Sequence, residues 1–300
     1  MIEVPSSTFM SAAPDWGWYI ALYFFFGGLA GGCYFLAALI DLVGNPEDRP
    51  LARLGYYIAF PCVVISAMLL TLDLGQPLRF WHMLVESNTY RPMFKPWSPM
   101  SVGSWALLIF GFFSLLSFIG ALVEDNRLDW PAGRSIRRPG ALSRLIAVIG
   151  GLFGFYVAGY TGVLLAVTNR PIWSDTPLLG LLFVVSAASI SAALMILLAR
   201  KTISTAPGLE SLHRIDAWVV ALELLVLIAL MITLGPVFRA WLNVWGLLLL
   251  LVIIIGMLVP LALYFRRGWL GDRNTQTAAA LVLLGGFILR VVIIFSAQSV

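Results

Sequence analysis

The sequence predicts an all-α membrane protein with eight transmembrane helices. Of its 300 residues, 60% are hydrophobic and 11% are charged, and the mean hydropathy is +0.93. A soluble domain cannot bury this much apolar surface. A hydrocarbon core about 30 Å thick needs roughly 20 apolar residues per helix, and the chain divides into eight such stretches. We therefore interpret residues 1–300 as a single integral membrane domain.

The spans are separated by charged residues and by breaks rich in Pro and Gly. The first span follows a segment without Lys or Arg and is long enough to cross the bilayer, so we expect it to be retained and not cleaved as a signal peptide. The eight spans are predicted at residues 17–43, 52–74, 101–123, 144–168, 177–199, 215–235, 243–265 and 276–297.

Basic residues predict the orientation. Thirteen of the nineteen Lys and Arg residues fall beside loops that follow odd-numbered spans, and five fall on the other side. By the positive-inside rule the first group is cytoplasmic, which places both the N and C termini outside the cytoplasm. The net charge of +4 then reports topology, and no nucleic-acid partner is expected.

The longest predicted outer connection runs from Gly75 to about Met100 and is rich in aromatic residues and Pro. Its apolar side chains cannot all face water. We expect an ordered segment that folds back over the bundle as an interfacial helix or a lid.

A weak internal repeat relates the two halves. The segment Leu74–Trp81 shares Leu, Gly, Arg and Trp at the same offsets with Leu234–Trp241, 160 residues later. At the same spacing, small residues at 27–32 fall on small residues at 187–192. The pattern is compatible with chance, or with two parallel four-helix bundles formed by half-repeats at 17–168 and 177–297.

Ionisable residues inside spans are candidates for function, because each costs about 2.5–3.5 kcal/mol on insertion scales. One interpretation is structural: Arg290 forms an ion bridge with Asp73 or Glu223. The other makes Glu223, at mid-depth, part of a proton path. The further members of that path would be Tyr156, Asp216 and His213.

Tyr160 is the first candidate for a ligand contact. It lies deep in the fourth span between Gly159 and Gly162, which leave room for a flat ring. A quinone needs an apolar slot and hydrogen-bond donors for its carbonyls. The donors expected on this side are Tyr160, Tyr23, His82 and Arg79.

The counts of His and Cys limit the cofactors. His82 and His213 are the two His residues and fall on opposite sides of the membrane, so no bis-histidine haem is expected. Cys33 and Cys62 lie within apolar stretches, which predicts no iron–sulfur cluster or metal site in this chain. Electrons would have to be delivered by a partner.

Six runs of sequence resemble the NrfD/PsrC family, the membrane subunits of polysulfide-reductase-like complexes. In chain order these runs are WGWYIALYFFFGGLAGG (16–32), LDLGQPLRFWHML (72–84), SPMSVGSWAL (98–107), YTGVLLAVTNRPIW (160–173), LHRIDAWVVALELL (212–225) and GGFILRVVIIFSAQ (285–298).

The resemblance implies a haem-free anchor in the inner membrane of a prokaryote. Such a subunit binds a quinone, either menaquinone or ubiquinone, and exchanges electrons with an iron–sulfur subunit on the outer face, often joined to a molybdenum catalytic subunit. The resemblance also implicates Tyr160 and the segment from Asp73 to His82 in quinone binding, and leaves proton translocation as a further expectation. The alternative is a secondary transporter built around Glu223 and Arg290.

Overall fold

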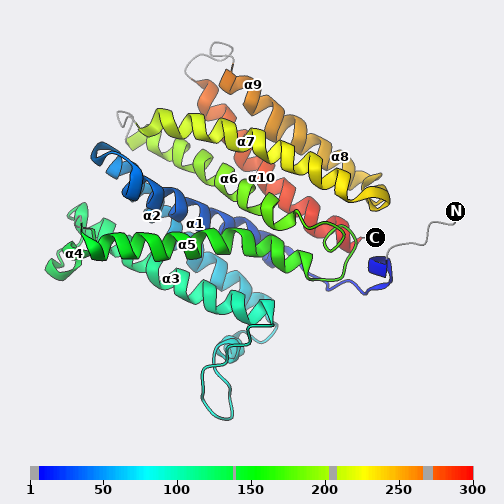
Figure 1. Ribbon diagram of the computed structural model, residues 1–300, viewed down its shortest axis with the longest axis horizontal. Coiled ribbons are helices and arrows are strands. Elements are labelled where there is room, and N and C mark those ends of the chain that lie inside the picture. The colour runs from blue at the N-terminus through cyan, green and yellow to red at the C-terminus, as the bar shows by residue number, and fades with distance from the viewer. Residues whose placement is uncertain (1–6, 138–139, 203–207, 266–272, 300) are drawn as a thin grey trace.

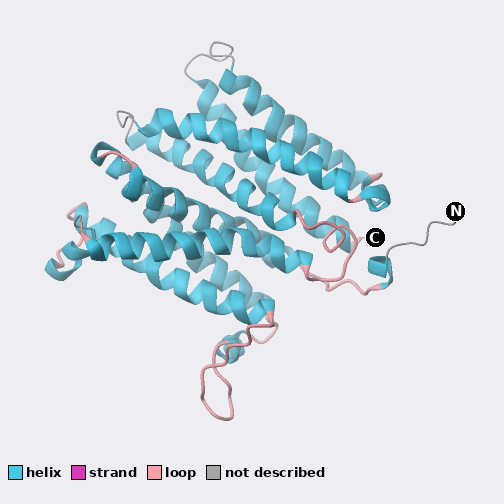
Figure 2. Ribbon diagram, in the orientation of Figure 1, coloured by secondary structure: helices cyan, strands magenta, loops and turns pink. Residues whose placement is uncertain are grey.

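The computed structural model describes residues 7–137, 140–202, 208–265 and 273–299. Helices dominate these ranges, which hold no strand (Figure 2). Eight helical segments are long and apolar enough to cross a membrane, so the chain is a multi-pass integral membrane protein. The spans are α1 Trp18–Val43, α2 Arg49–Asp73, α3 Pro99–Glu124, α5 Ala141–Ala166, α6 Leu179–Thr202, α7 Gly208–Thr233, a composite of α8 Val244–Leu251, η6 Val252–Leu258 and α9 Val259–Phe265, and α10 Asn274–Gln298.

The number of spans is as predicted, and most of their ends agree within three residues. The exception is α7, which begins at Gly208, seven residues before the predicted start at 215. Its first turns contain the charged Glu210 and Arg214, ahead of the predicted start, and the buried Leu209 and Leu212 hold them to the bundle. A hydropathy pattern stops at such charges, whereas the helix continues because one face still packs.

The two ends of the bundle carry different elements. The terminal face carries the short helix η1 Ser7–Met10, residues 167–178, η5 Gly235–Trp241 and the C-terminal end of α10. The basic face, at the opposite end, carries η2 Pro46–Asp48, η4 Pro131–Gly133 and α4 Arg134–Arg137. Figure 1 shows η1 and the C-terminal end of α10 on the same side, as an even number of spans requires.

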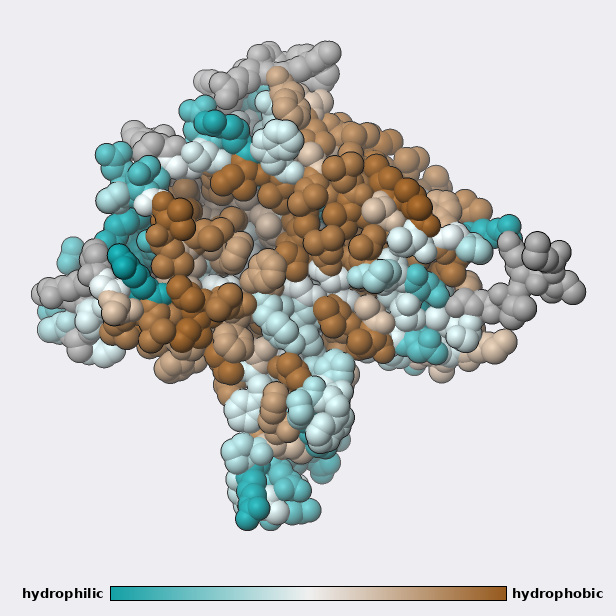
Figure 3. Space-filling view, viewed as in Figure 1, coloured by the Kyte–Doolittle hydropathy of each residue, from teal (hydrophilic) through white to brown (hydrophobic). Residues whose placement is uncertain are grey.

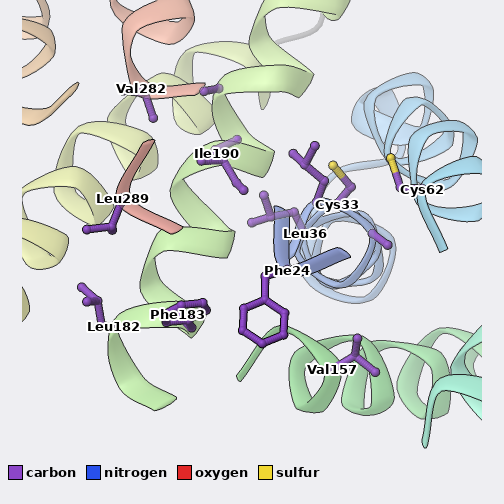
Figure 4. Packing of buried hydrophobic residues seen from close by; sticks show 14 of the residues in the cluster. Phe24, Cys33, Leu36, Cys62, Val157, Leu182, Phe183, Ile190, Val282 and Leu289 are labelled. Carbon is purple, nitrogen blue, oxygen red and sulfur yellow. The ribbon is translucent and has the colours of Figure 1, made fainter. Parts of the chain in front are cut away.

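The centre of the bundle is formed by α1 and α6. In the most hydrophobic 18-residue stretch of each of these two spans, 61% and 67% of the residues are buried. These shares are higher than in the other six spans. They pack closely because of small residues: a Cβ on Gly32 would lie 2.6 Å from the Ala187 carbonyl oxygen. Around them, Phe24 of α1 points toward Val157 of α5 with Phe183 of α6 beside it (Figure 4).

The flank of the bundle is apolar between its two ends. Figure 3 shows hydrophobic side chains over this band, with polar residues gathered toward the ends of the spans. Within the band, Leu152, Leu225 and Ile232 are more than 60% exposed. An exposed belt of this kind is the surface expected to contact lipid chains.

The connection between α2 and α3 does not cover the bundle. Residues 75–98, which we name the arm, include η3 Pro77–Met83 and a turn closed by a bridge between Val85 and Pro92. The expectation of order is confirmed, but the expected lid is wrong: Figure 1 shows the arm extending sideways from the terminal face. The Trp105 indole fixes that direction by donating to the Met93 carbonyl oxygen at 2.9 Å.

The two segments behind the proposed repeat share a local structure. Gly75 and Gly235 have φ angles of +65° and +50°, a left-handed conformation that glycine adopts at low cost. Each follows a long helix and precedes or begins a seven-residue 3₁₀-helix. The similarity of the two turns agrees with the repeat, which remains a prediction for the two halves as a whole.

Charged residues tie together the helices at the basic face. Arg137 of α4 is buried and contacts Asp41 of α1, and its Nε lies 2.8 Å from Glu124 of α3. Arg53 and Arg49 of α2 reach the same Glu124 carboxylate at 3.2 and 3.3 Å. Burial by itself lowers the pKa of Arg137, but the adjacent carboxylates outweigh it and raise that pKa. This network holds the short helix α4 against the spans.

Candidate functional site

Three tyrosines meet near the terminal face. Tyr156 and Tyr160 are one turn apart on α5 and their rings stack at 5.7 Å with an interplanar angle of 25°. Tyr23 of α1 lies close enough to both to interact with them electrostatically. We name these residues the tyrosine cluster. An apolar bundle here presents three aromatic rings and three hydroxyl groups at one place.

The cluster depends on a glycine in a neighbouring helix. A Cβ on Gly103 of α3 would fall on the Tyr160 ring, so only glycine lets that ring lie against the helix backbone. The Tyr160 hydroxyl donates to the Pro99 carbonyl oxygen at 2.7 Å. At Gly27, one turn after Tyr23 on α1, a Cβ would make only an ordinary contact with the Tyr23 ring, at 3.6 Å. Tyr23 and Tyr160 are buried, whereas Tyr156 is 40% exposed.

The other predicted quinone contacts lie apart from this cluster. Asp73 ends α2 and Arg79 lies on the arm, and both are exposed. His82 is half-buried, with its ring against that of Trp81. Within the described ranges, no hydrogen bond, ion pair or ring contact joins these three residues to the tyrosine cluster. The structure therefore groups Tyr160 with Tyr23, and adds Tyr156, which the sequence had suggested for the proton path.

Arg290 is buried where α10 meets α1 and α6. Its Nε donates to the Phe24 carbonyl oxygen at 3.1 Å, and Nη1 donates to the Ser186 hydroxyl at 3.0 Å and to the Gly286 carbonyl oxygen at 2.7 Å. The guanidinium lies over the ring of Phe183, 5.4 Å from its centroid. Nη2 is buried without a hydrogen-bond partner among the described residues.

Glu223 of α7 is buried near the same serine. Ser186 and Ser189 of α6 face its carboxyl group, and the charge of Arg290 acts on it. The two charged groups form no ion pair within 4 Å in the part of the chain described here, so Ser186 lies between them. The Ser186 hydroxyl therefore links the Arg290 guanidinium to the Glu223 carboxyl group. Asp73, the other predicted partner of Arg290, is not part of this arrangement.

A second acid lies on α7 toward the basic face. Asp216 is fully buried, accepts a hydrogen bond from the Tyr264 hydroxyl of α9, and interacts electrostatically with Glu223 two turns away. Its other oxygen, Oδ1, is buried without a partner in the described ranges. His213 is half-buried one turn before Asp216. The series from Asp216 to Glu223, Ser186 and Arg290 extends from near the basic face to mid-depth.

Sequence reasoning missed several members of these two groups. The sequence did carry a signal for Ser186 and Ser189, which are polar residues one turn apart in an apolar span. It also carried one for Tyr264, a phenol near the end of the seventh span. The role of Gly103 had no signal in the sequence, because it depends on which ring lies against that glycine. Metal ligands are not gathered either: the described residues contain no group of three or more His, Cys, Asp or Glu side chains placed to hold an ion.

Comparison with known proteins assigns the chain to a family. Residues 6–300 match the family described as "Polysulphide reductase, NrfD". The chain belongs to this family. Among its relatives, a polysulfide reductase chain of Wolinella succinogenes is 27% identical over 317 aligned residues, which cover 95% of this protein and 94% of that one. Protein NrfD of Escherichia coli is 25% identical over 334 aligned residues, covering 98% of each protein.

A shorter match reaches a further relative. A selenate reductase subunit of Mesobacillus selenatarsenatis is 28% identical over 107 residues, which cover 36% of this protein and 23% of that one. The resemblance inferred from the six runs is thus confirmed by the family match across the whole chain. A location in the inner membrane is consistent with these prokaryotic relatives.

Proposed function

We propose that the protein is the quinone-reactive membrane subunit of a respiratory reductase complex. Its family and its relatives, which include proteins named for polysulfide and selenate reductases, support the membrane-subunit role. The observation that carries the quinone-reactive role is the tyrosine cluster, a set of phenols near the terminal face of the bundle. The same family assignment favours this function over a secondary transporter.

The cluster suits a quinone because it combines ring faces with donors. The half-exposed ring of Tyr156 offers a stacking surface, and the hydroxyl groups of Tyr23 and Tyr160 lie beside it. Bound there, quinone supplies the two-electron redox chemistry, while this chain supplies position, hydrogen bonds and exclusion of water. Tyr160 would exchange its bond to the Pro99 carbonyl for one to a quinone oxygen.

We place the electron-transfer partner on the terminal face, which the distribution of Lys and Arg assigns to the outside. An iron–sulfur subunit docked there, itself joined to a molybdenum catalytic subunit, would lie on the same side as the tyrosine cluster. The arm adds exposed apolar residues to this face, among them Leu78 at 89% and Trp97 at 79% exposure. Exposed groups of this size favour a protein or membrane contact.

Quinol turnover by the assembled complex tests the cluster. We expect Tyr160→Phe to lower turnover about tenfold, because a hydrogen bond to a polar ligand group contributes roughly 1–1.5 kcal/mol. The matched control is Tyr19→Phe, which removes a hydroxyl from a half-exposed residue of α1 outside the cluster. Undiminished turnover in Tyr160→Phe, with quinone still bound, would remove this residue from the site.

The buried acids support a second part of the proposal, proton movement through α7. Asp216, Glu223 and Ser186 form a polar series in the hydrocarbon layer, where each such group is costly. We expect Glu223→Gln to lower the proton-to-electron ratio in vesicles while the complex stays assembled. Glu47→Gln, at an exposed position on η2, is the control. An unchanged ratio in Glu223→Gln would contradict this part alone.

A further inference from the structure

Arg290 of α10 contacts the turn of α1 that directly follows Tyr23. Its Nε donates to the Phe24 carbonyl oxygen at 3.1 Å. Its Nη2 lies against the backbone of the same turn, because a Cβ on Gly28 would be only 2.9 Å from this atom. Glycine at position 28 therefore lets a positive charge approach the part of α1 that begins beside the tyrosine cluster.

Aromatic rings occupy the space between the guanidinium and Tyr23. The rings of Tyr23 and Phe24 meet edge to face at 5.4 Å, and those of Phe24 and Phe183 of α6 do so at 5.8 Å. Figure 4 shows Phe24 and Phe183 beside each other, and the Arg290 guanidinium lies over the Phe183 ring. All three residues are at most 2% exposed. A charge acts more strongly through such a buried region than through water.

Another edge of the guanidinium leads to Glu223 of α7. Nη1 donates to the Ser186 hydroxyl at 3.0 Å, and Ser186 also faces the Glu223 carboxyl group. In the described ranges, the charged groups that interact with this carboxyl group are Arg290 and Asp216, two turns earlier on α7. Arg290 therefore lies between the tyrosine cluster of the first half and a proton-binding group of the second.

The packing of α1 against α6 does not by itself need this charge. Small residues already bring the two helices together: beside Arg290, a Cβ on Gly28 would meet the Ala187 Cβ at 3.5 Å, and one turn later a Cβ on Gly32 would collide with the Ser191 hydroxyl. A charge inside a span is costly, and such residues commonly serve a ligand or proton path. The contacts of Arg290 indicate what it connects.

We propose that Arg290 is a positioning residue that couples the redox state of quinone at the tyrosine cluster to the protonation of Glu223. The inference rests on the proposed quinone-reactive role. Reduction replaces carbonyl oxygens, which only accept hydrogen bonds, by hydroxyl groups, which also donate one. The change in charge and hydrogen bonding beside Tyr23 alters the potential at Arg290, and Arg290 transmits it to Glu223. The reduction takes two electrons from the partner and two protons, and the coupling itself transfers neither.

Such a coupling is reciprocal, because each site changes the binding free energy of the other by the same amount. When Glu223 is protonated, the charge of Arg290 loses its neutralising partner. The electron-rich carbonyl oxygens of the quinone are then favoured over the hydroxyl groups of the quinol. The redox state of the ligand in the first half therefore controls the acid at mid-depth of α7.

Infrared difference spectroscopy of the full-length protein in lipid nanodiscs tests the coupling. The probes are menadione and decylubiquinone, reduced electrochemically while bound, and the readout is the C=O band of a protonated carboxyl group. We expect reduction to change this band in the native protein, and Glu223→Gln to abolish the change. Ser186→Ala, which removes the hydroxyl between the two charged groups, should lower its amplitude at least twofold. The matched control is Ser191→Ala on the same helix, whose hydroxyl instead donates to the Leu29 carbonyl oxygen, and it should keep the full amplitude.

Substitutions of Arg290 test whether its charge carries the effect. Arg290→Gln should abolish the carboxyl change while the bands of the bound quinone persist, and Arg290→Lys, which keeps the charge, should retain at least half of the amplitude. A full carboxyl change in Arg290→Gln would overturn the coupling. If that protein is not recovered, Ser186→Ala decides, because an amplitude equal to that of Ser191→Ala would overturn it as well.

The same spectra separate a failure of the coupling from a failure of the proposed function. A native protein that shows no bands of bound quinone has no quinone site, and the proposed function and the coupling then fail together. Quinone bands without a carboxyl change that depends on Glu223 overturn the coupling alone.

Discussion

Arg290 shows how a charge is held inside this bundle. Its guanidinium is 1% exposed and is satisfied mainly by neutral acceptors, two of which are backbone carbonyl oxygens. The neutralising acid, Glu223, acts through the hydroxyl of Ser186. Removal of either charge leaves the other buried without compensation, which is more costly than removal of both.

The two charges should therefore be coupled in a double-mutant cycle. We expect Arg290→Met to lower the free energy of unfolding by about 3–5 kcal/mol, because the buried Glu223 carboxyl group then loses its compensating charge. Adding Glu223→Gln should recover part of that loss. Thermal unfolding of the purified protein in detergent measures all four variants, and additive effects would show that the residues are independent.

Single residues were partly predictable from the sequence. Tyr160, Glu223 and Arg290 were identified because an ionisable or phenolic group in an apolar span is unusual. Their partners were not identified, because hydrogen bonds such as that from Arg290 to the Phe24 carbonyl join residues 266 positions apart. Nothing local in a sequence encodes such a pairing.

At the scale of helices, α3 and α5 meet through one glycine. Gly103→Ala would place a methyl group on the Tyr160 ring, so either the ring or α3 must move. We expect a loss of about 1–3 kcal/mol in stability, as overpacking typically gives, together with reduced quinol turnover. Gly111→Ala on the same helix is the control, since a Cβ there meets nothing within 4 Å. Thermal unfolding and turnover measure both variants, and equal effects would show that Gly103 has no special role.

The helices were easier to predict than the connections. Runs of apolar residues determine the spans, because every backbone group in lipid must be satisfied within a helix. The direction of the arm was missed, since it depends on the left-handed turn at Gly75 and on the bond from Trp105 to Met93. The composition of the arm predicts that its apolar residues contact protein or lipid, but it does not predict the direction in which the arm extends.

The orientation of the whole molecule predicts a labelling pattern. Cys33 and Cys62 are free and buried, so the native protein should give little background with a membrane-impermeant maleimide. In intact cells we expect Ser87→Cys, on the exposed arm, to be labelled from outside. Asn45→Cys, on the basic face, should be labelled only after the cells are permeabilised. The reverse pattern would invert the proposed orientation and move the quinone-reactive face to the cytoplasm.

Segment η6, Val252–Leu258, in the seventh span is a π-helix, and this wider turn has a consequence for comparing relatives. An extra residue in a regular span rotates everything beyond it by about 100°, which turns its core-facing side away from the core. The wide turn over Val252–Leu258 accommodates such a residue locally, beside the close contact between Gly256 and Gly285 of α10. A relative one residue shorter here can keep both ends of this span in register, so an alignment gap at this position carries no penalty in packing.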